Sequence, residues 1–409
     1  MRKTLIVVLV VIAALVAAYF LAAGIIDLRI KAVSGRLERA GYAVAAEELP
    51  RLFADGSKEA AAVLRQAAEH FPKDERGRIA GFDTLGWKTD PAGLRALRTE
   101  KAEGLRLMLK ASTMGQANFE MDYENGMNAQ LCGILSQFGY GRTCLSVEAR
   151  ALAAEGRADS ALGMVDASLR LSHALAEPVF IYTLVELLGL DSALAQAARL
   201  SAVASPAAVE RVVTTIRGLN PNADLTKSLQ GDGAWVRNAI RSGHTFVVAE
   251  NQGEPGFSTP ALWFLPLRRY AELKQLEAEE QQLAFAGRPW YEGLPLLESH
   301  ERSFAFEDSS PMRRLARFGV VNMRPFYQRI ERNSVLRDLA LAAIAVTTER
   351  RKTGRLPEML DPSLPADRFT GKSCGYKATP GGFVVYSAGR DGEDNGGDPE
   401  KDLVIDVRI

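Results

Sequence analysis

The sequence predicts a mainly α-helical protein with an N-terminal transmembrane helix, a helical-hairpin body and a small α+β module at the C-terminus. Three observations support this prediction. An uncharged apolar run stands near the N-terminus, Ala and Leu recur at three- and four-residue intervals through most of the chain, and strand-like runs flank a loop near the C-terminus. The composition, 47% hydrophobic and 24% charged over 409 residues, is typical of a globular protein and allows two or three domains.

The first 27 residues are predicted to form a short cytoplasmic tail and a membrane anchor. Arg2 and Lys3 are followed by an uncharged apolar run over residues 5–26. As a helix this run covers roughly 33 Å, which is enough to cross a hydrocarbon core. A cleaved signal peptide is one alternative, because Ala22-Ala23-Gly24 offers a small-residue cleavage site, and a buried core helix is another.

Charge gives little guidance about partners or membrane orientation. The 50 Lys and Arg residues equal the 50 Asp and Glu residues, so no net field attracts nucleic acid, and we expect no nucleic-acid partner. More basic residues follow the apolar run than precede it, namely Arg29, Lys31, Arg36 and Arg39 against Arg2 and Lys3. We still expect a single-pass protein of the bacterial inner (cytoplasmic) membrane with its bulk in the periplasm. An acidic loop near the C-terminus, described below, would need the calcium-rich side of the membrane.

Residues 28–220 are predicted to form the helical body. Three helix starts carry capping residues: Ser57, Asp90 followed by Pro91, and Ser205 followed by Pro206. An Asp or Ser side chain can accept a hydrogen bond from the first turn, and Pro is tolerated there because its missing N–H needs no partner.

One stretch, residues 144–178, is predicted to fold as a helical hairpin. Gly156 can end its first helix and Asp159 can start its second. The unit resembles a tetratricopeptide repeat, with Ala161 at the packing position of the second helix and Val165 one turn later. Generic packing of antiparallel helices would place the same small residues at the crossing, and both interpretations stay open.

Residues 221–331 are predicted to form an irregular and helical segment that packs on the body. Breakers are frequent in its first part, where we expect Trp235, Trp263 and Phe264 to pack a loop against the helices. The charged stretch from Arg268 to Gly287 is predicted to be a solvated helix.

No motif in the chain names an enzymatic activity. The sequence contains no phosphate-binding glycine loop, no dinucleotide fingerprint and no nucleophile elbow. Glu120, Asp122 and Glu124 are close enough to suggest a carboxylate pair for hydrolysis, but at alternating spacing they share a face only on a strand. We therefore predict a polar inter-helix turn and no enzyme. The four histidines are widely separated and fit no metal motif: His70, His173, His244 and His300.

The three cysteines are few and irregularly spaced. Their number is odd, and no Cys-x-x-Cys spacing points to a metal. Cys132 and Cys144 could form a disulfide in an oxidising compartment, whereas free thiols buried in helices are the alternative, and Cys374 stands apart.

The stretch "AGRDGEDNGGDPEKD", residues 388–402, is predicted to be an acidic loop. It separates a β-favouring run over residues 383–386 from a terminal run, "LVIDVRI". Clustered carboxylates repel one another unless a cation neutralises them, and Ca²⁺ takes six to eight oxygen ligands. The spacing approximates the ligand pattern of an EF-hand loop, but the flanking runs are strands and not helices. We therefore do not predict an EF-hand fold, and expect only that the side chains of this loop supply oxygen ligands.

The C-terminal region, predicted as a module over residues 332–409, resembles that of the major pseudopilins of type II secretion systems. The resemblance is carried by Gly354, Pro357, Asp367, Phe369, Gly371, Tyr376, Tyr386, Ser387, Gly389, Asp391, Gly392, Gly396, Gly397 and Asp402. It implies structural calcium in the loop, with ligands drawn from Asp391, Asp394, Asn395, Asp398 and Asp402. The pseudopilin N-terminal start is missing, so filament assembly does not follow. A metal-free turn, in which Asp and Asn bond their own backbone, is the alternative.

Together these features predict a membrane-anchored interaction or scaffold protein of the cell envelope, with a protein or peptide partner and a structural calcium ion. The layout also resembles that of uncharacterised bacterial membrane-anchored proteins. Two alternatives remain: a pseudopilin-like component of a secretion or filament assembly system, and an envelope hydrolase using carboxylates.

Overall fold

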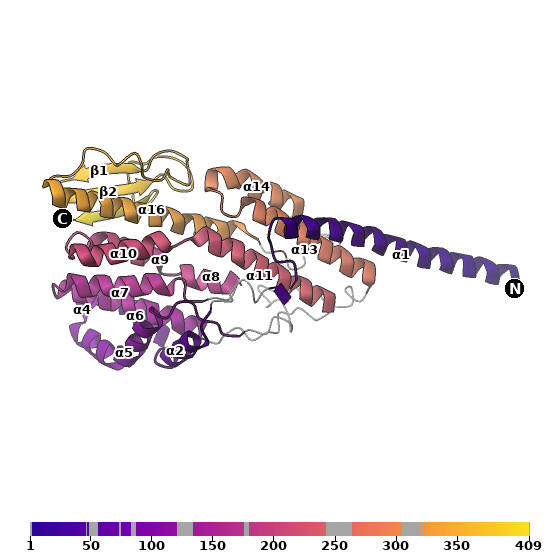
Figure 1. The fold of residues 1–409 in the computed structure, drawn as a ribbon, viewed down its shortest axis with the longest axis horizontal. Coiled ribbons are helices and arrows are strands. Elements are labelled where there is room, and N and C mark those ends of the chain that lie inside the picture. Colours follow the sequence, from indigo (N-terminus) through magenta and orange to yellow (C-terminus); the bar gives the residue numbers. More distant parts are fainter. Residues whose placement is uncertain are drawn as a thin grey trace.

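The structure, a computed structural model, is a layered helical body from which one long helix projects (Figure 1). The N-terminus lies at the far end of this helix, and the C-terminal sheet lies at the opposite end of the molecule. The structure describes residues 2–45, 47–48, 56–72, 75–82, 87–120, 134–175, 180–242, 264–304, 320 and 322–408.

The projecting helix, α1 (Arg2–Arg39), contains the predicted anchor. Its 38 residues cover about 57 Å. Large apolar side chains such as Ile6, Leu15 and Leu21 are exposed, and Ala23 is the first buried side chain among those that the structure describes. Within the described residues, α1 is the one helix long and apolar enough to cross a membrane, which fits a signal anchor or a signal peptide.

The body is a stack of helix layers that the sheet closes at one end. The first layer packs α2 and α5 together, α6 and α7 form the second, α9 and α10 lie over α7, and α16 covers α9 and α10 from the other side (Figure 1). Each layer therefore contacts mainly its neighbours, as in helical-repeat proteins. The bounds are α2 (Lys58–Glu69), α3 (Arg76–Gly81), α4 (Trp87–Thr89), α5 (Pro91–Ala111), α6 (Leu135–Ala154), α7 (Ala158–Leu171), α8 (Phe180–Leu187), α9 (Leu190–Leu200), α10 (Pro206–Gly218) and α16 (Arg324–Thr353).

The predicted helix caps are confirmed. Ser57 Oγ accepts from the backbone N–H of Ala60, the Asp90 side chain accepts from Gly93, and Ser205 Oγ accepts from Ala208. Pro follows Asp90 and Ser205 in the first turn of α5 and α10. These caps depend only on neighbouring residues.

The predicted hairpin is also present, as α6 and α7. Gly156 adopts φ +76° just after α6, and Ala161 and Val165 are buried. Asp159 does not cap α7, which begins at Ala158. Its Oδ1 instead accepts from the N–H of Ser205, so it ties the start of α7 to the start of α10 at 2.6 Å.

Residues 221–242 and 264–304 are more regular and more buried than predicted. Helix α11 (Pro221–Ser242) begins directly at Pro221, and Trp235 is buried within it, not in a loop. Helix α13 (Leu265–Phe285) is not a solvated helix, because α1, α11 and α14 (Trp290–Phe304) all pack against it. Its buried polar side chains are Glu272, Gln275, Glu279 and Gln282. Trp263 lies outside the described residues, and Phe264 contacts α1 through Tyr19.

The C-terminal sheet has three antiparallel strands in the order β1-β2-β3: β1 (Gly375–Thr379), β2 (Gly382–Ser387) and β3 (Leu403–Arg408). Strands β2 and β3 are the predicted arms, with Val385 opposite Ile405. Phe383, Val385, Ile405 and Val407 are fully buried, and β2 and β3 pack on α16. Gly382 is required where it stands, since a Cβ there would meet the Val407 carbonyl oxygen at 1.9 Å.

The C-terminal module shares its core with the body. The predicted boundary between residues 331 and 332 falls inside α16, which runs unbroken through it. Glu331 is fully buried, forms a two-point ion pair with Arg368 of the C-terminal segment, and accepts from the backbone N–H of Trp290. Burial raises the pKa of Glu331, and Arg368 opposes that rise. One buried carboxylate thus joins α14, α16 and the C-terminal segment.

Candidate functional site

The acidic loop joins β2 to β3 and bonds largely to its own backbone. Asp391 Oδ1 accepts from the N–H of Glu393, Asp394 Oδ1 from Gly396, and Asp398 Oδ1 from Glu400. Each is the short side-chain turn typical of Asp in tight loops.

Asp402 is the buried carboxylate of the loop, at 4% exposure. Its two oxygens accept from the backbone N–H groups of Asn395, at 3.4 Å, and Gly397, at 2.7 Å. It therefore holds the loop against the start of β3. The side-chain amide nitrogen of Asn395 donates to the carbonyl oxygen of Glu393.

The five predicted calcium ligands do not converge in this structure. Nowhere in the described ranges, which include the whole loop, do three or more His, Cys, Asp or Glu side chains form a group that could hold a metal ion. In the hydrogen bonds described above, Asp391 and Asp398 each use one carboxylate oxygen. Calcium binding by this loop therefore remains a prediction from the resemblance.

The other sequence candidates are scattered. Glu120 is exposed, has φ +56° and pairs with Lys58, while Asp122 and Glu124 lie outside the described residues, as do Cys132 and His244. Cys144 is a buried free thiol.

The described histidines lie apart from one another. His70 lies at the end of α2 and His173 pairs with Asp224 at 3.2 Å, whereas His300 is buried in α14. None of these residues marks a site.

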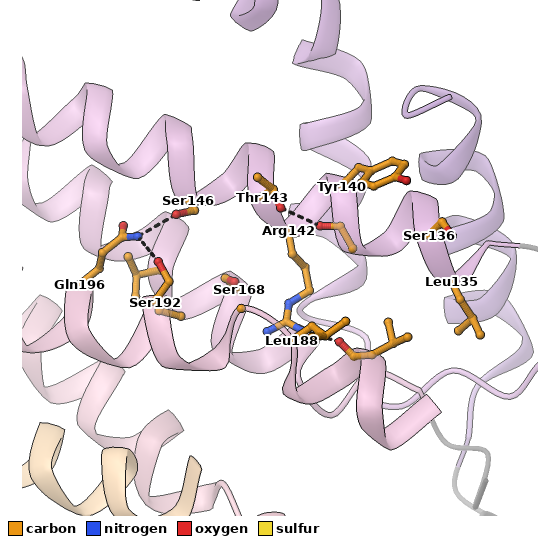
Figure 2. Close-up of a pocket in the computed structure, with 15 residues that line it drawn as sticks. Leu135, Ser136, Tyr140, Arg142, Thr143, Ser146, Ser168, Leu188, Ser192 and Gln196 are labelled. Carbon is orange, nitrogen blue, oxygen red and sulfur yellow. Dashed lines mark hydrogen bonds between the residues drawn. The ribbon is translucent and has the colours of Figure 1, made fainter. Parts of the chain in front are cut away.

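A cavity lies instead within the helical body, between α6 and α9 and over α7 (Figure 2). It measures about 510 Å³, within the range of about 300–1,000 Å³ typical of ligand sites. Val165 and Ser168 of α7 line it between two walls. One wall is the α6 stretch from Leu135 to Ser146, and the other runs from Val185 of α8 through Leu188 and Gly189 to Gln196 of α9. We call this cavity the α6–α9 pocket.

Gln196 spans the two walls of the α6–α9 pocket. Its amide nitrogen donates to Ser146 Oγ on α6 at 2.7 Å and to Ser192 Oγ on α9 at 3.0 Å (Figure 2). The side chain is 8% exposed, and its Oε1 has no hydrogen-bond partner among the described residues. Because Ser can donate or accept, exchanging the amide oxygen and nitrogen would still leave one polar atom without a partner.

Arg142 is the buried charge of the α6–α9 pocket. It is 3% exposed, and its guanidinium donates to the carbonyl oxygens of Val185 and Glu186 and to Ser172 Oγ. Its Nε has no partner among the described residues. Burial lowers the pKa of Arg142 to about 10, and Glu186 opposes the shift.

Glu186 lies behind the guanidinium of Arg142. Burial, and next the nearby Asp224, raise its pKa well above the usual range, while Oε1 accepts from the Leu175 N–H at 2.7 Å. The wall behind the α6–α9 pocket thus contains a buried cation and a carboxyl group that resists ionisation.

No specific sequence signal points to the α6–α9 pocket. Its lining residues come from four helices and one linker, and its serines and glycines look like the small residues of any helix crossing. The chain matches no protein-family model, no curated protein and no solved structure. The pseudopilin and tetratricopeptide resemblances therefore depend only on the residues that carry them.

Proposed function

We propose that this protein is a membrane-anchored interaction protein of the cell envelope, whose α6–α9 pocket binds a peptide segment of a partner protein. The observation that carries the proposal is the pair of buried polar atoms without partners, Gln196 Oε1 and Arg142 Nε, in a pocket that also has apolar walls. An unsatisfied buried polar group costs about 1–3 kcal/mol, so a ligand that satisfies it gains affinity.

A peptide has the chemistry that these atoms require. Each residue offers a carbonyl oxygen for a guanidinium N–H and an amide N–H for a carboxamide oxygen. An apolar side chain of the peptide would pack on Leu135, Val165 and Leu188. No carboxylate, imidazole or thiol stands among the described lining residues, so the serines there have no adjacent base, and binding is better supported than catalysis.

The place of the protein in the cell is part of the proposal. The exposed apolar half of α1 supports a single-pass anchor in the inner membrane of a bacterium, with the layered body on the periplasmic side. A stack of helix layers offers an extended surface beside the α6–α9 pocket, which suits an interaction partner.

Photo-crosslinking with a matched pair of glycine variants tests peptide binding. A photoreactive residue at Leu188, at the mouth of the pocket and 51% exposed, is compared with one at Val203, 68% exposed outside it. Gly139 lines the pocket and Gly163 does not, and a Cβ on either would meet no atom within 4 Å. Gly139→Leu should fill the pocket, whereas Gly163→Leu makes the same change elsewhere on a helix.

We expect a discrete protein adduct at Leu188 and not at Val203. The adduct should disappear with Gly139→Leu and persist with Gly163→Leu. Both variants should keep the fold, because Leu is a better helix former than Gly and a Cβ at either position meets no atom within 4 Å. An adduct that Gly139→Leu leaves unchanged would remove the α6–α9 pocket from the proposal.

For the acidic loop we propose the structural calcium ion that the resemblance implies. A thermal melt with calcium and with a chelator tests it, beside Asp391→Asn. Asn can still accept from the Glu393 N–H, as Asp391 does, but lacks the charge that attracts a cation. An ion at a hundred times its dissociation constant adds about 2.7 kcal/mol, so calcium should raise the midpoint of the wild type and not that of Asp391→Asn. Equal melting temperatures of the wild type with and without calcium would show that the loop binds no calcium ion.

A further inference from the structure

Helices α1 and α13 lie side by side and run in the same direction (Figure 1). Contacting residue numbers rise together along the pair. Tyr19 contacts Phe264, with ring centroids 5.0 Å apart, and three ion pairs follow: Asp27 with Arg269, Arg29 with Glu277, and Arg36 with Glu280. The direction of α1 therefore also fixes the direction of α13.

The first turn of α13 lies at the level of the apolar run of α1. Tyr19 stands seven residues before Ile26, the last residue of that run, which corresponds to about 10 Å along a helix. Phe264, at its side, is consequently level with residues that the proposed anchor places in the bilayer. Asp27, at the end of the run, is level with Arg269 instead.

The residues of this turn suit a membrane boundary. Phe264 is 49% exposed, and Leu265 and Leu267 are partly exposed. Arg268 and Arg269 follow at once, so an apolar turn precedes a basic pair in the same order as on α1, where Arg29 follows the apolar run. Aromatic and apolar side chains at the acyl boundary, with Arg at the headgroups, are typical of segments that lie in the membrane interface.

The base of this turn is held by the body. Val236, Ala239, Ile240 and Ala271 form a small separate core, against which Leu267 and Tyr270 pack. Helix α11 runs antiparallel to α13 there, with Arg241 paired to Glu272 and Arg237 to Glu279. The exposed apolar side chains of the turn thus stand on a rigid two-helix support and continue the exposed apolar surface of α1.

We propose that the first turn of α13, residues 264–267, inserts into the bilayer beside α1, so that two adjacent segments fix the orientation of the body on the membrane. The proposal rests on the anchoring role of α1 proposed above. The partner of this turn is the lipid bilayer, because the turn continues the apolar surface of α1 and lies level with the apolar run of that helix.

Site-specific photo-crosslinking to lipid tests the inference on the full chain. The chain is reconstituted into nanodiscs of phosphatidylethanolamine and phosphatidylglycerol with a photoreactive residue at Leu15, Phe264 or Tyr291. Leu15 is 65% exposed in the apolar run and reports on the anchor alone. Tyr291 is an aromatic control of similar exposure to Phe264, 46%, and lies against Gly371 of the C-terminal segment. Mass spectrometry identifies what each residue captures.

We expect lipid adducts at Leu15 and Phe264 and none at Tyr291. Lipid at Leu15 without lipid at Phe264 overturns this inference and leaves the anchor intact. No lipid at Leu15 overturns the anchor and the inference together. Capture of a second copy of the chain at Phe264, or as much lipid at Tyr291 as at Phe264, also overturns the inference.

Discussion

Helix α13 and the acidic loop over residues 388–402 are both rich in charged side chains. The partners of these side chains, however, lie at very different distances along the chain. The carboxylates of α13 pair with arginines of α1 and α11, with Glu277 and Arg29 separated by 248 positions. Two of them, Glu272 and Glu277, also pair with a basic residue three positions away on α13. The loop carboxylates bond backbone N–H groups two to seven residues away. One segment holds the body together, and the other shapes a turn.

Burial follows the same division. Glu279 is almost fully buried and depends on Arg237, a partner that tertiary packing supplies, whereas Asp391 and Asp394 are exposed. Losing a partner in the interior leaves a charge with neither water nor a counterion, which costs far more than losing a surface turn. Charge content alone therefore does not distinguish a solvated segment from a buried one.

We expect the greatest loss of stability from a substitution in the buried pair of Arg237 and Glu279. Arg237 is completely buried and also donates to the Val44 carbonyl, and Gly233 leaves the space that the Glu279 carboxylate occupies. Glu279→Ala should lower the free energy of unfolding by about 3–5 kcal/mol, because it leaves a buried guanidinium without its counterion. Urea denaturation in detergent, followed by circular dichroism, measures the loss.

Glu280→Ala is the matched control for that variant. It removes the same residue type one position further along α13, from an ion pair in which Arg36 is exposed. Its effect should be much smaller. Equal losses of stability from the two substitutions would show that burial does not decide how much a carboxylate contributes. The contrast between the buried charges of α13 and the exposed charges of the loop would then have no energetic basis.

A pH dependence should follow from His300, which α14 buries against α13. The imidazole is 1% exposed, between the rings of Phe285 and Phe304, and burial lowers its pKa to about 4 from 6.5. Between these values the unfolded chain binds more protons than the folded one. Stability is therefore full above pH 6.5 and falls as the pH drops toward 4, by about 3 kcal/mol.

The variant His300→Gln should flatten this slope. His70→Gln, at a partly buried histidine at the end of α2, is the control and should keep it. Denaturation midpoints between pH 4 and 7 give the measurement. A wild-type slope that survives His300→Gln would assign the acid sensitivity to another group.

A smaller effect is expected at Asp402, the buried member of the loop. Asp402→Ala removes the acceptor for the N–H groups of Asn395 and Gly397 and should cost about 2 kcal/mol. Asp391→Ala, at an exposed loop position, should change stability by less than about 0.5 kcal/mol. Hydrogen exchange of β2 and β3 would locate the loss of protection, and a global loss would contradict a local role.

Local features of the fold were predictable from the sequence, and distant ones were not. The caps at Ser57, Asp90 and Ser205 depend on residues three positions away, so their chemistry is visible in the sequence. The arms of the acidic loop were predictable for the same reason. Helix α13 was wrongly predicted as solvated because its partners, such as Arg36 and Arg237, lie far away in the chain.

The α6–α9 pocket shows the same limit for a site. Gln196 lines the pocket because α9 packs beside Ser146 of α6, fifty positions away, and nothing near Gln196 in the sequence signals this contact. The calcium ligands, by contrast, were proposed from adjacent residues. The structure places those residues in one loop, where one carboxylate oxygen of Asp391 and one of Asp398 accept from backbone N–H groups.

The smallest expected effect concerns Arg36 and Glu280, the surface pair that fastens α1 to α13. Two hydrogen bonds of 2.6 and 2.8 Å join them, raising the pKa of Arg36 and lowering that of Glu280. Water and salt screen such a pair, so a double-mutant cycle of Arg36→Ala and Glu280→Ala should show weak coupling. The coupling should vanish near 1 M salt, where the screening length is about 3 Å. If it persists there, the pair is shielded from water, and α1 and α13 would be joined by an interior contact such as the one at Glu279.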